Sequence, residues 1–372
     1  MPFRDPSVTL FLCGDVMTGR GVDQILEHSV NPQLHEPWVK DARDYVKLAE
    51  RRNGPIDQPV SDEYIWGDAL AELEQRQPAL RFINLETSIT TSSTPWPGKG
   101  IHYRMHPGNV SCLKAAGVDG CSVANNHVLD WDQDGLSETL EVLEAAGIAA
   151  VGAGRNADQA SQPAIFDIGE GRRAVVCACG LGSSGVSESW AAGPDQAGVF
   201  RLPDLSRDSV RRISEIVSAV RKEDDIAILS IHWGSNWGYD VEDEQKRFAH
   251  DVIDSAGIDL VHGHSSHHPR GMEVYRNRLI LYGCGDFIND YEGISGNEEY
   301  RGDLTLMYFP SFSVETGELL SLHMVPLKME QMRLRYPSQK DREWLAGTIA
   351  RINRPLGTAC DLTPEGELVL GW

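Results

Sequence analysis

The chain has 372 residues, a formal net charge of −21, and 41% hydrophobic but only 8% aromatic residues. This length suits one large α/β domain with an appendage, or two domains. The acidic charge argues against nucleic acid as a partner, because phosphates require a basic face, and against adsorption to an anionic membrane.

The N-terminal sequence, the lengths of the apolar stretches and the cysteines bear on the cellular location of the protein. The apolar run "VTLFLC" near the N-terminus has six residues and passes directly into a polar turn, so we predict no signal peptide. No stretch of about 18 apolar residues occurs, which predicts no membrane insertion. The seven cysteines are odd in number and scattered through apolar segments, as expected for reduced core thiols. We therefore predict a cytoplasmic protein.

Apolar segments of strand length alternate with amphipathic segments of helical period along the chain. The predicted strands are residues 8–15, 80–86, 120–126, 148–154, 226–234 and 258–264. The predicted helices are residues 109–117, 136–147, 209–224 and 243–257. Hairpins are predicted at residues 164–180, 272–287 and 303–328.

This alternation predicts an α/β protein whose mixed sheet is covered on both faces, with a largely antiparallel second sheet from the late hairpins packed beside it. We expect one main domain over residues 1–326. Residues 28–66, which are rich in Pro and Asp, form a long insertion and a candidate lid. The tail, residues 327–372, contains one helix and a last strand, and is expected to pack on the domain as an appendage.

Side chains that can bind a metal follow one predicted strand after another, at the carboxyl edge where open α/β sheets bind ligands. These side chains are Asp15, Glu86, Asn126, His127, His232, His264 and His267. Carboxylate, amide and imidazole without thiolate suit divalent ions, with Mn²⁺, Zn²⁺ or Fe²⁺ first and Ca²⁺ or Mg²⁺ as alternatives. A carboxylate such as Glu86 can bridge two ions about 3.5–4 Å apart.

Five segments in consistent order carry a family resemblance: "GD" at 14–15, "NLE" at 84–86, "ANNHVLD" at 124–130, "HWG" at 232–234 and "GHSSHHP" at 263–269. Over residues ~8–326 the chain resembles the CapA-like family of poly-γ-glutamate capsule proteins, a branch of the calcineurin-like metallophosphoesterases. The resemblance implies a four-layer α-β-β-α sandwich with two mixed sheets.

The resemblance also implies two metal sites that share Glu86. One would use Asp15, Glu86 and His267, and the other Glu86, Asn126, His232 and His264. His127 would be the catalytic acid or base, with Asp130 orienting it. The chain departs from the phosphoesterase pattern twice: Met17 stands at a histidine position, and "NLE" replaces Gly-Asp-x-x-Asp. Both departures argue against ordinary phosphate-ester hydrolysis.

Several nearby residues have two interpretations. His262 and His268 are expected to support the site rather than bind metal. Tyr103 and Arg104, with Trp233 and Trp237, are candidate substrate-binding residues. A surface ion pair would explain Arg104 equally well, and burial in the core is the commoner explanation for the two tryptophans. Asp286, in "GCGDFIND", is interpreted as part of a tight turn.

The first functional hypothesis is a metal-dependent enzyme that acts on a peptide or amide carbonyl, with Cα epimerisation of a residue in a ribosomal peptide precursor as the favoured reaction. This rests on the resemblance, because CapA-like proteins resemble epimerases of that kind. Three alternatives stay open: poly-γ-glutamate synthesis or amide hydrolysis, a metallophosphoesterase, and a non-catalytic module that binds a peptide or a polymer. The expected partner is a peptide or poly-amino-acid substrate.

Overall fold

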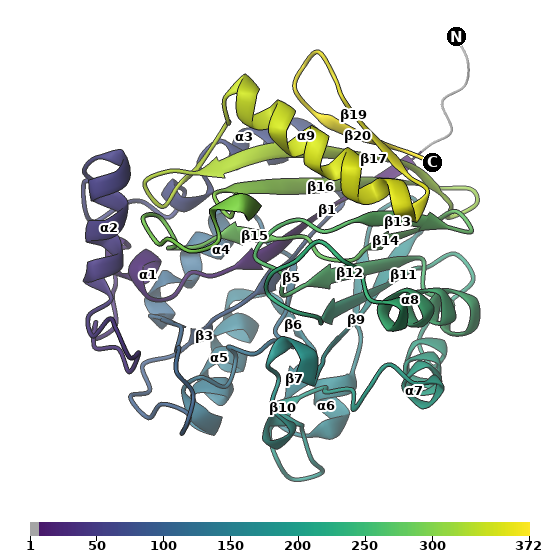
Figure 1. Ribbon diagram of the computed structural model, residues 1–372. Coiled ribbons are helices and arrows are strands. Elements are labelled where there is room, and N and C mark those ends of the chain that lie inside the picture. Colours follow the sequence, from purple (N-terminus) through teal and green to yellow (C-terminus); the bar gives the residue numbers. More distant parts are fainter. Residues whose placement is uncertain (1–6) are drawn as a thin grey trace.

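Two β-sheets lie at the centre of the molecule, as a computed structural model that describes residues 7–372 shows (Figure 1). Residues 1–6 lie outside the described part; they include the start of the predicted main domain and part of the N-terminal stretch for which we predict no signal peptide. The larger sheet has ten strands and the smaller has six. The predicted α/β class with two mixed sheets and helices outside them is confirmed.

The ten-stranded sheet combines a parallel half with an antiparallel half. The parallel order β1-β2-β5-β6, with β15 also parallel to β1, joins the antiparallel order β1-β16-β17-β20-β19, and β18 pairs with β17. The strands are β1 (Ser7–Val16), β2 (Leu80–Leu85), β5 (Gly120–Ser122), β6 (Ala149–Val151), β15 (Asp286–Ile288), β16 (Leu304–Ser313), β17 (Leu319–Met329), β18 (Leu334–Arg335), β19 (Ala359–Leu362) and β20 (Leu368–Gly371).

The six-stranded sheet has the order β13-β14-β12-β11-β9-β8, with its four central strands parallel. The strands are β8 (Ala164–Asp167), β9 (Arg173–Gly180), β11 (Ile226–His232), β12 (Leu260–His264), β13 (Met272–Tyr275) and β14 (Arg278–Leu281). Alternate side chains of β11 enter two cores: Ile226 and Ile228 join the cluster shared with the ten-stranded sheet, and Leu229 faces a second cluster. Because successive side chains of a strand point to opposite faces of the sheet, one core lies between the two sheets and the other lies on the outer face of the six-stranded sheet.

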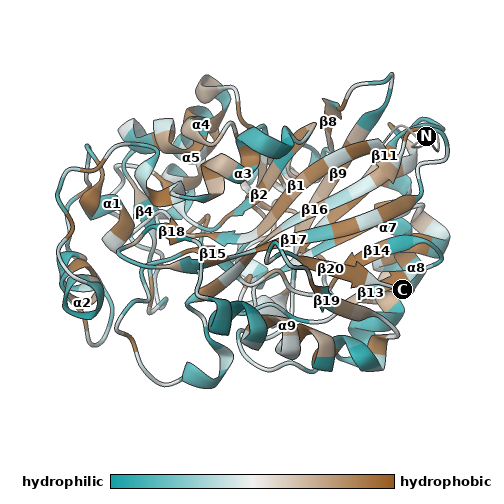
Figure 2. Ribbon diagram, turned by 90° about the horizontal axis from the view of Figure 1, so that it is seen from above, coloured by the Kyte–Doolittle hydropathy of each residue, from teal (hydrophilic) through white to brown (hydrophobic). Residues whose placement is uncertain are grey.

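The helices cover the outer faces of the sheets. Helices α7 and α8 pack on each other and, through Val210, Ile213 and Phe248, on the six-stranded sheet. Figure 2 shows brown strands in the interior and mostly teal, polar helix surfaces around them. The helices are α1 (Gly21–Ile25), α2 (Arg43–Asn53), α3 (Ala69–Arg76), α4 (Ser111–Ala115), α5 (Asp132–Ala146), α6 (Ala157–Ser161), α7 (Arg207–Ser218), α8 (Asp243–Ala256) and α9 (Gln339–Asn353).

The late hairpins and the tail differ from the sequence-based expectation. The hairpin β13–β14 extends the six-stranded sheet, whereas β16–β17 extends the ten-stranded sheet, so the hairpins do not form a sheet of their own. Residue 326 lies inside β17, and the tail adds β18 and β20 to the same sheet while α9 packs on β19. Residues 327–372 thus add strands to the ten-stranded sheet, and the division of the chain at residue 326 stays a prediction.

The segment 28–66 is fastened to the body by buried polar contacts. Glu36 forms an ion pair with Arg20 at 2.9 Å, and Arg20 also pairs with Asp290. Leu26 forms a β-bridge with Val60 across the base of this segment. A lid that opens at residues 28–66 would have to separate the Arg20–Glu36 pair, and the lid role stays a prediction.

Two further expectations concern the membrane and the cysteines. Within residues 7–372, none of the helices combines the length and the apolar character that crossing a membrane requires. All seven cysteines are buried and unbridged. Cys177 and Cys179 share one face of β9, as their spacing predicts, and both face the cluster under α7 and α8.

Candidate metal centre

Two groups of ligand atoms lie together at the carboxyl ends of the strands. Asp15, His232 and His264 each offer an atom within 4.8 Å of the others, and so do Asp15, His267 and Asp286. The two groups share Asp15, whereas the resemblance implies that Glu86 is shared. Glu86 lies beside them, with its Oε1 3.9 Å from Nε2 of His232.

Strand register brings these residues to one place. In the six-stranded sheet His232 and His264 end neighbouring parallel strands and are register partners. In the ten-stranded sheet Asp15 is the partner of both Asn84 and Asp286. Gly14 permits this approach, because a Cβ at that position would lie 1.6 Å from the carbonyl oxygen of Gly285.

A relay of hydrogen bonds sets the tautomers of His262 and His264. His262 Nε2 donates to the carbonyl oxygen of Cys13 at 2.7 Å, which joins the two sheets. Its Nδ1 therefore accepts from Ser230 Oγ at 3.1 Å, and the same hydroxyl accepts from His264 Nε2 at 2.9 Å. His264 Nδ1 is consequently a lone pair that points at the centre. His262 thus supports the site, as predicted, by orienting a candidate ligand.

His232 forms a hydrogen bond with Asn126 at the same place. Its Nε2 lies 3.0 Å from Asn126 Oδ1 and donates to it, because an amide oxygen only accepts. His232 Nδ1 therefore carries a lone pair and lies 2.8 Å from Nδ1 of His264, which also carries one. Both lone pairs are thus available to a cation beside Asp15, and the ligand role of Asn126 stays a prediction.

The buried carboxyl groups of the centre carry shifted pKa values. Burial, with repulsion from Asp286, raises the pKa of Asp15 from its ordinary value of 3.8 to about 7. Burial and the neighbouring Asp15 also raise the pKa of Glu86 well above its usual range. Burial alone would lower the pKa of His267, but attraction to Asp286, whose Oδ1 lies 2.8 Å from Nδ1 of His267, outweighs it and raises this pKa.

The residues of this centre fit a divalent cation. Asp15 Oδ2 is buried and has no hydrogen-bond partner among residues 7–372. Burial also lowers the pKa values of His232 and His264 well below the ordinary value, so both are neutral at pH 7 and can ligate. Uncompensated buried carboxylates beside neutral imidazoles form a donor set that suits Mn²⁺, Zn²⁺ or Fe²⁺. A bound ion of this kind would polarise a carbonyl or phosphoryl oxygen and acidify water.

A hydrogen-bonded pair, His127 and Asp130, lies next to these candidate ligands. His127 Nδ1 lies 2.6 Å from Asp130 Oδ2, and its Nε2 lies 3.8 Å from Glu86 Oε1, on the side of the metal centre. Lys99 Nζ contacts Asp130 and lies 3.2 Å from His127 Nδ1. Burial, together with Lys99 and against the pull of Asp130, lowers the pKa of His127 to about 4. His127 is therefore a neutral base at pH 7 whose free nitrogen faces the centre.

The predicted substrate-binding residues have separate locations. Tyr103 packs its ring edge on His127, with ring centroids 4.7 Å apart, and Trp237 lies 5.2 Å from the His267 ring. Trp233 is only 1% exposed and packs on Phe248, so it belongs to the core and offers no surface to a substrate. The Arg104 guanidinium lies over Trp131, not at the metal centre.

Three polar residues of the centre escaped the sequence-based prediction. Asp286, interpreted as a turn residue, lies beside Asp15; it follows an apolar hairpin strand, and the strand-end rule could have found it. Asn84 donates to Asp15 Oδ1 at 2.8 Å and to Glu86 Oε2 at 3.1 Å, one position before the strand end. Lys99 comes from an irregular loop and has no signal of its own in the sequence.

The fold and this centre define a class: an α/β protein with two mixed sheets and a candidate metal centre at the carboxyl ends of strands from both. Residues 9–291 match the family described as "Bacterial capsule synthesis protein PGA_cap", and the chain belongs to this family. The matched range contains every candidate ligand, from Asp15 to Asp286.

The sequence relatives agree with this assignment. The chain is 48% identical, over 97% of its length and 95% of the relative, to a "Probable polyglutamine synthesis accessory protein" of Mycobacterium tuberculosis (strain ATCC 25618 / H37Rv). It is 26% identical to the "PGA biosynthesis protein CapA" of Bacillus subtilis (strain 168), over 77% of this chain and 65% of that one. A novel phosphatase of Mycoplasma pneumoniae aligns with 87% of this chain and 95% of its own at 13% identity, with a TM-score of 0.47, a likeness too weak to bear on the reaction.

Proposed function

We propose that this chain is a divalent-metal-dependent enzyme that cleaves or transfers amide bonds of a poly-amino-acid, with poly-γ-glutamate as the substrate class. The observation that carries the proposal is the His127–Asp130 pair, whose free imidazole nitrogen faces Glu86 beside the candidate metal ligands. The substrate class is supported by the family and by the names of the relatives.

The residues of the chain account for the proton transfers of such a reaction. Asp130 accepts the Nδ1–H of His127 and so leaves Nε2 as the base, which takes a proton from water. The water oxygen forms a bond to the amide carbonyl carbon, the C–N bond breaks, and His127 returns the proton to the leaving amine. Lys99 and the backbone N–H of Tyr103, 2.6 Å from Asp130 Oδ2, keep Asp130 ionised, and its pKa is lowered because His127 and Lys99 outweigh the effect of burial.

Cα epimerisation, the reaction favoured by the sequence, stays an untested prediction. It would use the same base, but the proton would come from the α-carbon and no bond would break between residues. A single assay distinguishes the reactions: poly-γ-glutamate and model peptides are incubated with the protein and Mn²⁺ in D₂O, and new amino groups, chain length and α-deuterium are measured.

We expect new amino groups and shorter chains with the wild type and Mn²⁺, and a rate about 10²–10⁴-fold lower for His127→Gln. His323→Gln, in a half-exposed histidine of β17, is the matched control and retains the rate. Deuterium at the α-position without new amino groups would replace the proposal with epimerisation. Turnover of p-nitrophenyl phosphate alone would favour a phosphoesterase, and binding without any turnover would favour the non-catalytic module.

A further inference from the structure

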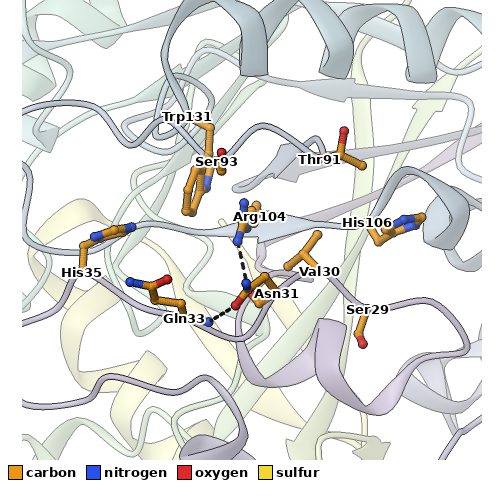
Figure 3. A pocket seen from close by; sticks show the side chains of 10 residues that line it. All are labelled: Ser29, Val30, Asn31, Gln33, His35, Thr91, Ser93, Arg104, His106 and Trp131. Atoms are coloured by element: carbon orange, nitrogen blue, oxygen red, sulfur yellow. Dashed lines mark hydrogen bonds between the residues drawn. The ribbon is translucent and has the colours of Figure 1, made fainter.

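A cavity of about 480 Å³ lies between the segment 28–66 and strand β4 (Arg104–Met105). This volume is within the range of sites that bind small ligands. Figure 3 shows Arg104 near the middle of the lining residues, with Trp131 and His35 to one side and His106 to the other. None of the metal-site residues lines this cavity.

Arg104 is a buried cation with neutral partners. Its two terminal nitrogens donate to the backbone carbonyl oxygens of Ser92 and, at 2.9 Å, of Asn31. Its guanidinium plane lies 3.8 Å from the ring centre of Trp131, and it forms no ion pair with any residue in the range 7–372. A guanidinium has five N–H donors in a planar fork, so donors remain for an anion. A buried charge of this kind is stabilised by an ionic partner, and a carboxylate fits the fork.

Two histidines line the cavity on either side of Arg104 (Figure 3). Burial, with His102 and Arg104 nearby, lowers the pKa of His35, and burial lowers the pKa of His106. Both imidazoles are therefore neutral at pH 7 and offer N–H donors without charge. The nearby acid Asp23 is already engaged, since its oxygens accept hydrogen bonds from the backbone N–H of His106 and of Val30.

The remaining acids of this region are engaged as well. Glu36 forms an ion pair with Arg20, Asp41 forms one with Arg43, and Glu138 accepts hydrogen bonds from Thr90 and Thr91. Among the residues that line the cavity, Arg104 alone carries a permanent charge and none is acidic, on a chain whose net charge is −21. A polyanionic substrate is repelled by the molecule as a whole, so it needs such a site to bind.

The cavity and the metal centre share two stretches of backbone. Tyr103 and Arg104 are consecutive, and while the Tyr103 ring contacts His127, the Arg104 side chain enters the cavity. Asp130 and Trp131 are also consecutive; Asp130 holds His127, and Trp131 forms a cavity wall and donates its Nε1–H to the Tyr103 carbonyl oxygen at 3.0 Å. The buried side chains of Tyr103, Asp130 and Trp131 separate the two places, so a ligand that reaches both must be a chain of several residues that passes around them.

We propose that this cavity is a subsite that binds a side carboxylate of the poly-amino-acid substrate, some residues away from the amide bond at the metal centre. The substrate class of this subsite rests on the proposed function. The subsite adds to that function a residue, Arg104, that recognises the carboxylates of the substrate. Arg104 binds the carboxylate through paired N–H groups, and His35 and His106 add donors at the rim.

The test measures binding in EDTA, so that metal-dependent turnover plays no part. The probe is a γ-linked glutamate oligomer of six residues, compared with the same oligomer carrying α-carboxamides and with inorganic phosphate. We expect Arg104→Gln to weaken oligomer binding about 10- to 100-fold, the effect of losing a charged paired hydrogen bond. His35→Gln should weaken it about threefold, and the control His323→Gln should leave it unchanged.

The outcomes separate the subsite from the proposed reaction. Equal binding of the carboxamide oligomer, or of phosphate, would overturn the subsite, as would unchanged binding by a folded Arg104→Gln. Should Arg104→Gln unfold the protein, because Ser92 and Asn31 lose their hydrogen-bond donor, the NMR signals of the His35 ring in the wild type are the test. They should shift when the oligomer binds, and signals that stay constant would overturn the proposal. A failure of the proposed function would be seen differently: with Mn²⁺ the protein would not cleave the amide bonds, although the oligomer would still bind.

Discussion

Replacing Asp15 with Asn should stabilise the protein without metal and weaken metal binding. Asp15 is fully buried, accepts a hydrogen bond from Asn84, and is repelled by Asp286. An amide retains the size of the carboxyl group and its bond to Asn84, but it removes the charge. The same change removes an anionic ligand shared by both groups of candidate ligand atoms.

The magnitude follows from the pKa of Asp15, which rises from 3.8 to about 7 on folding. Between these two values the carboxyl group is protonated in the folded chain and ionised in the unfolded chain, so stability falls as the pH rises through this window. A rise of about three pH units corresponds to about 4 kcal/mol at pH 8, and Asn behaves as a carboxyl that is always neutral. The free energy of unfolding of the variant should therefore exceed that of the wild type by about 2–4 kcal/mol at pH 8, and match it near pH 4.

The assay is urea unfolding in EDTA from pH 4 to 8, repeated with Mn²⁺. Excess Mn²⁺ at about 100 times its Kd should stabilise the wild type by about 2.7 kcal/mol and the variant much less. Asp195→Asn, at an exposed position, is the matched control. The reasoning is refuted if Asp15→Asn is less stable than the wild type at pH 8 in EDTA, or if the difference between them does not grow with pH.

Three further substitutions test the rest of the centre. His127→Gln should abolish amide cleavage yet retain bound Mn²⁺, measured by mass spectrometry of the metal content, and loss of the metal would instead make it a ligand. Asp286→Asn should weaken Mn²⁺ binding about 10- to 100-fold in a calorimetric titration, and unchanged affinity would return Asp286 to a role in the turn. His262 is not a candidate ligand, but His262→Gln breaks the hydrogen bond through Ser230 that orients His264, so Mn²⁺ affinity should fall about tenfold. An unaltered affinity would contradict this role of His262.

The strand ends of the centre could be predicted because they rest on local patterns. Buried apolar runs such as 226–232 have the length of strands, and a polar residue at the end of each run marks the carboxyl edge of the sheet. Parallel register then brings His232 beside His264. Their separation along the chain does not show this proximity, but the alternation of helix and strand implies that the two strands are parallel neighbours.

Other features depend on tertiary contacts that a linear pattern does not contain. Asp286 reaches Asp15 only because Gly14 lets β1 approach the backbone of Gly285. Lys99, which contacts Asp130, lies in a loop whose sequence has no periodicity. Arg104 follows Tyr103 directly, yet the two side chains serve different sites. Whether Trp233 lines a pocket or fills the core depends on Phe248 of α8, which packs on it.

The most direct test of the central claim is the metal content of the purified chain after dialysis against micromolar Mn²⁺. The wild type should retain at least one ion per chain, and Asp15→Asn combined with His264→Gln should retain less than about a tenth of that amount, with both proteins folded by circular dichroism. Equal metal content in the two proteins, or none in either, would contradict a metal centre at these strand ends.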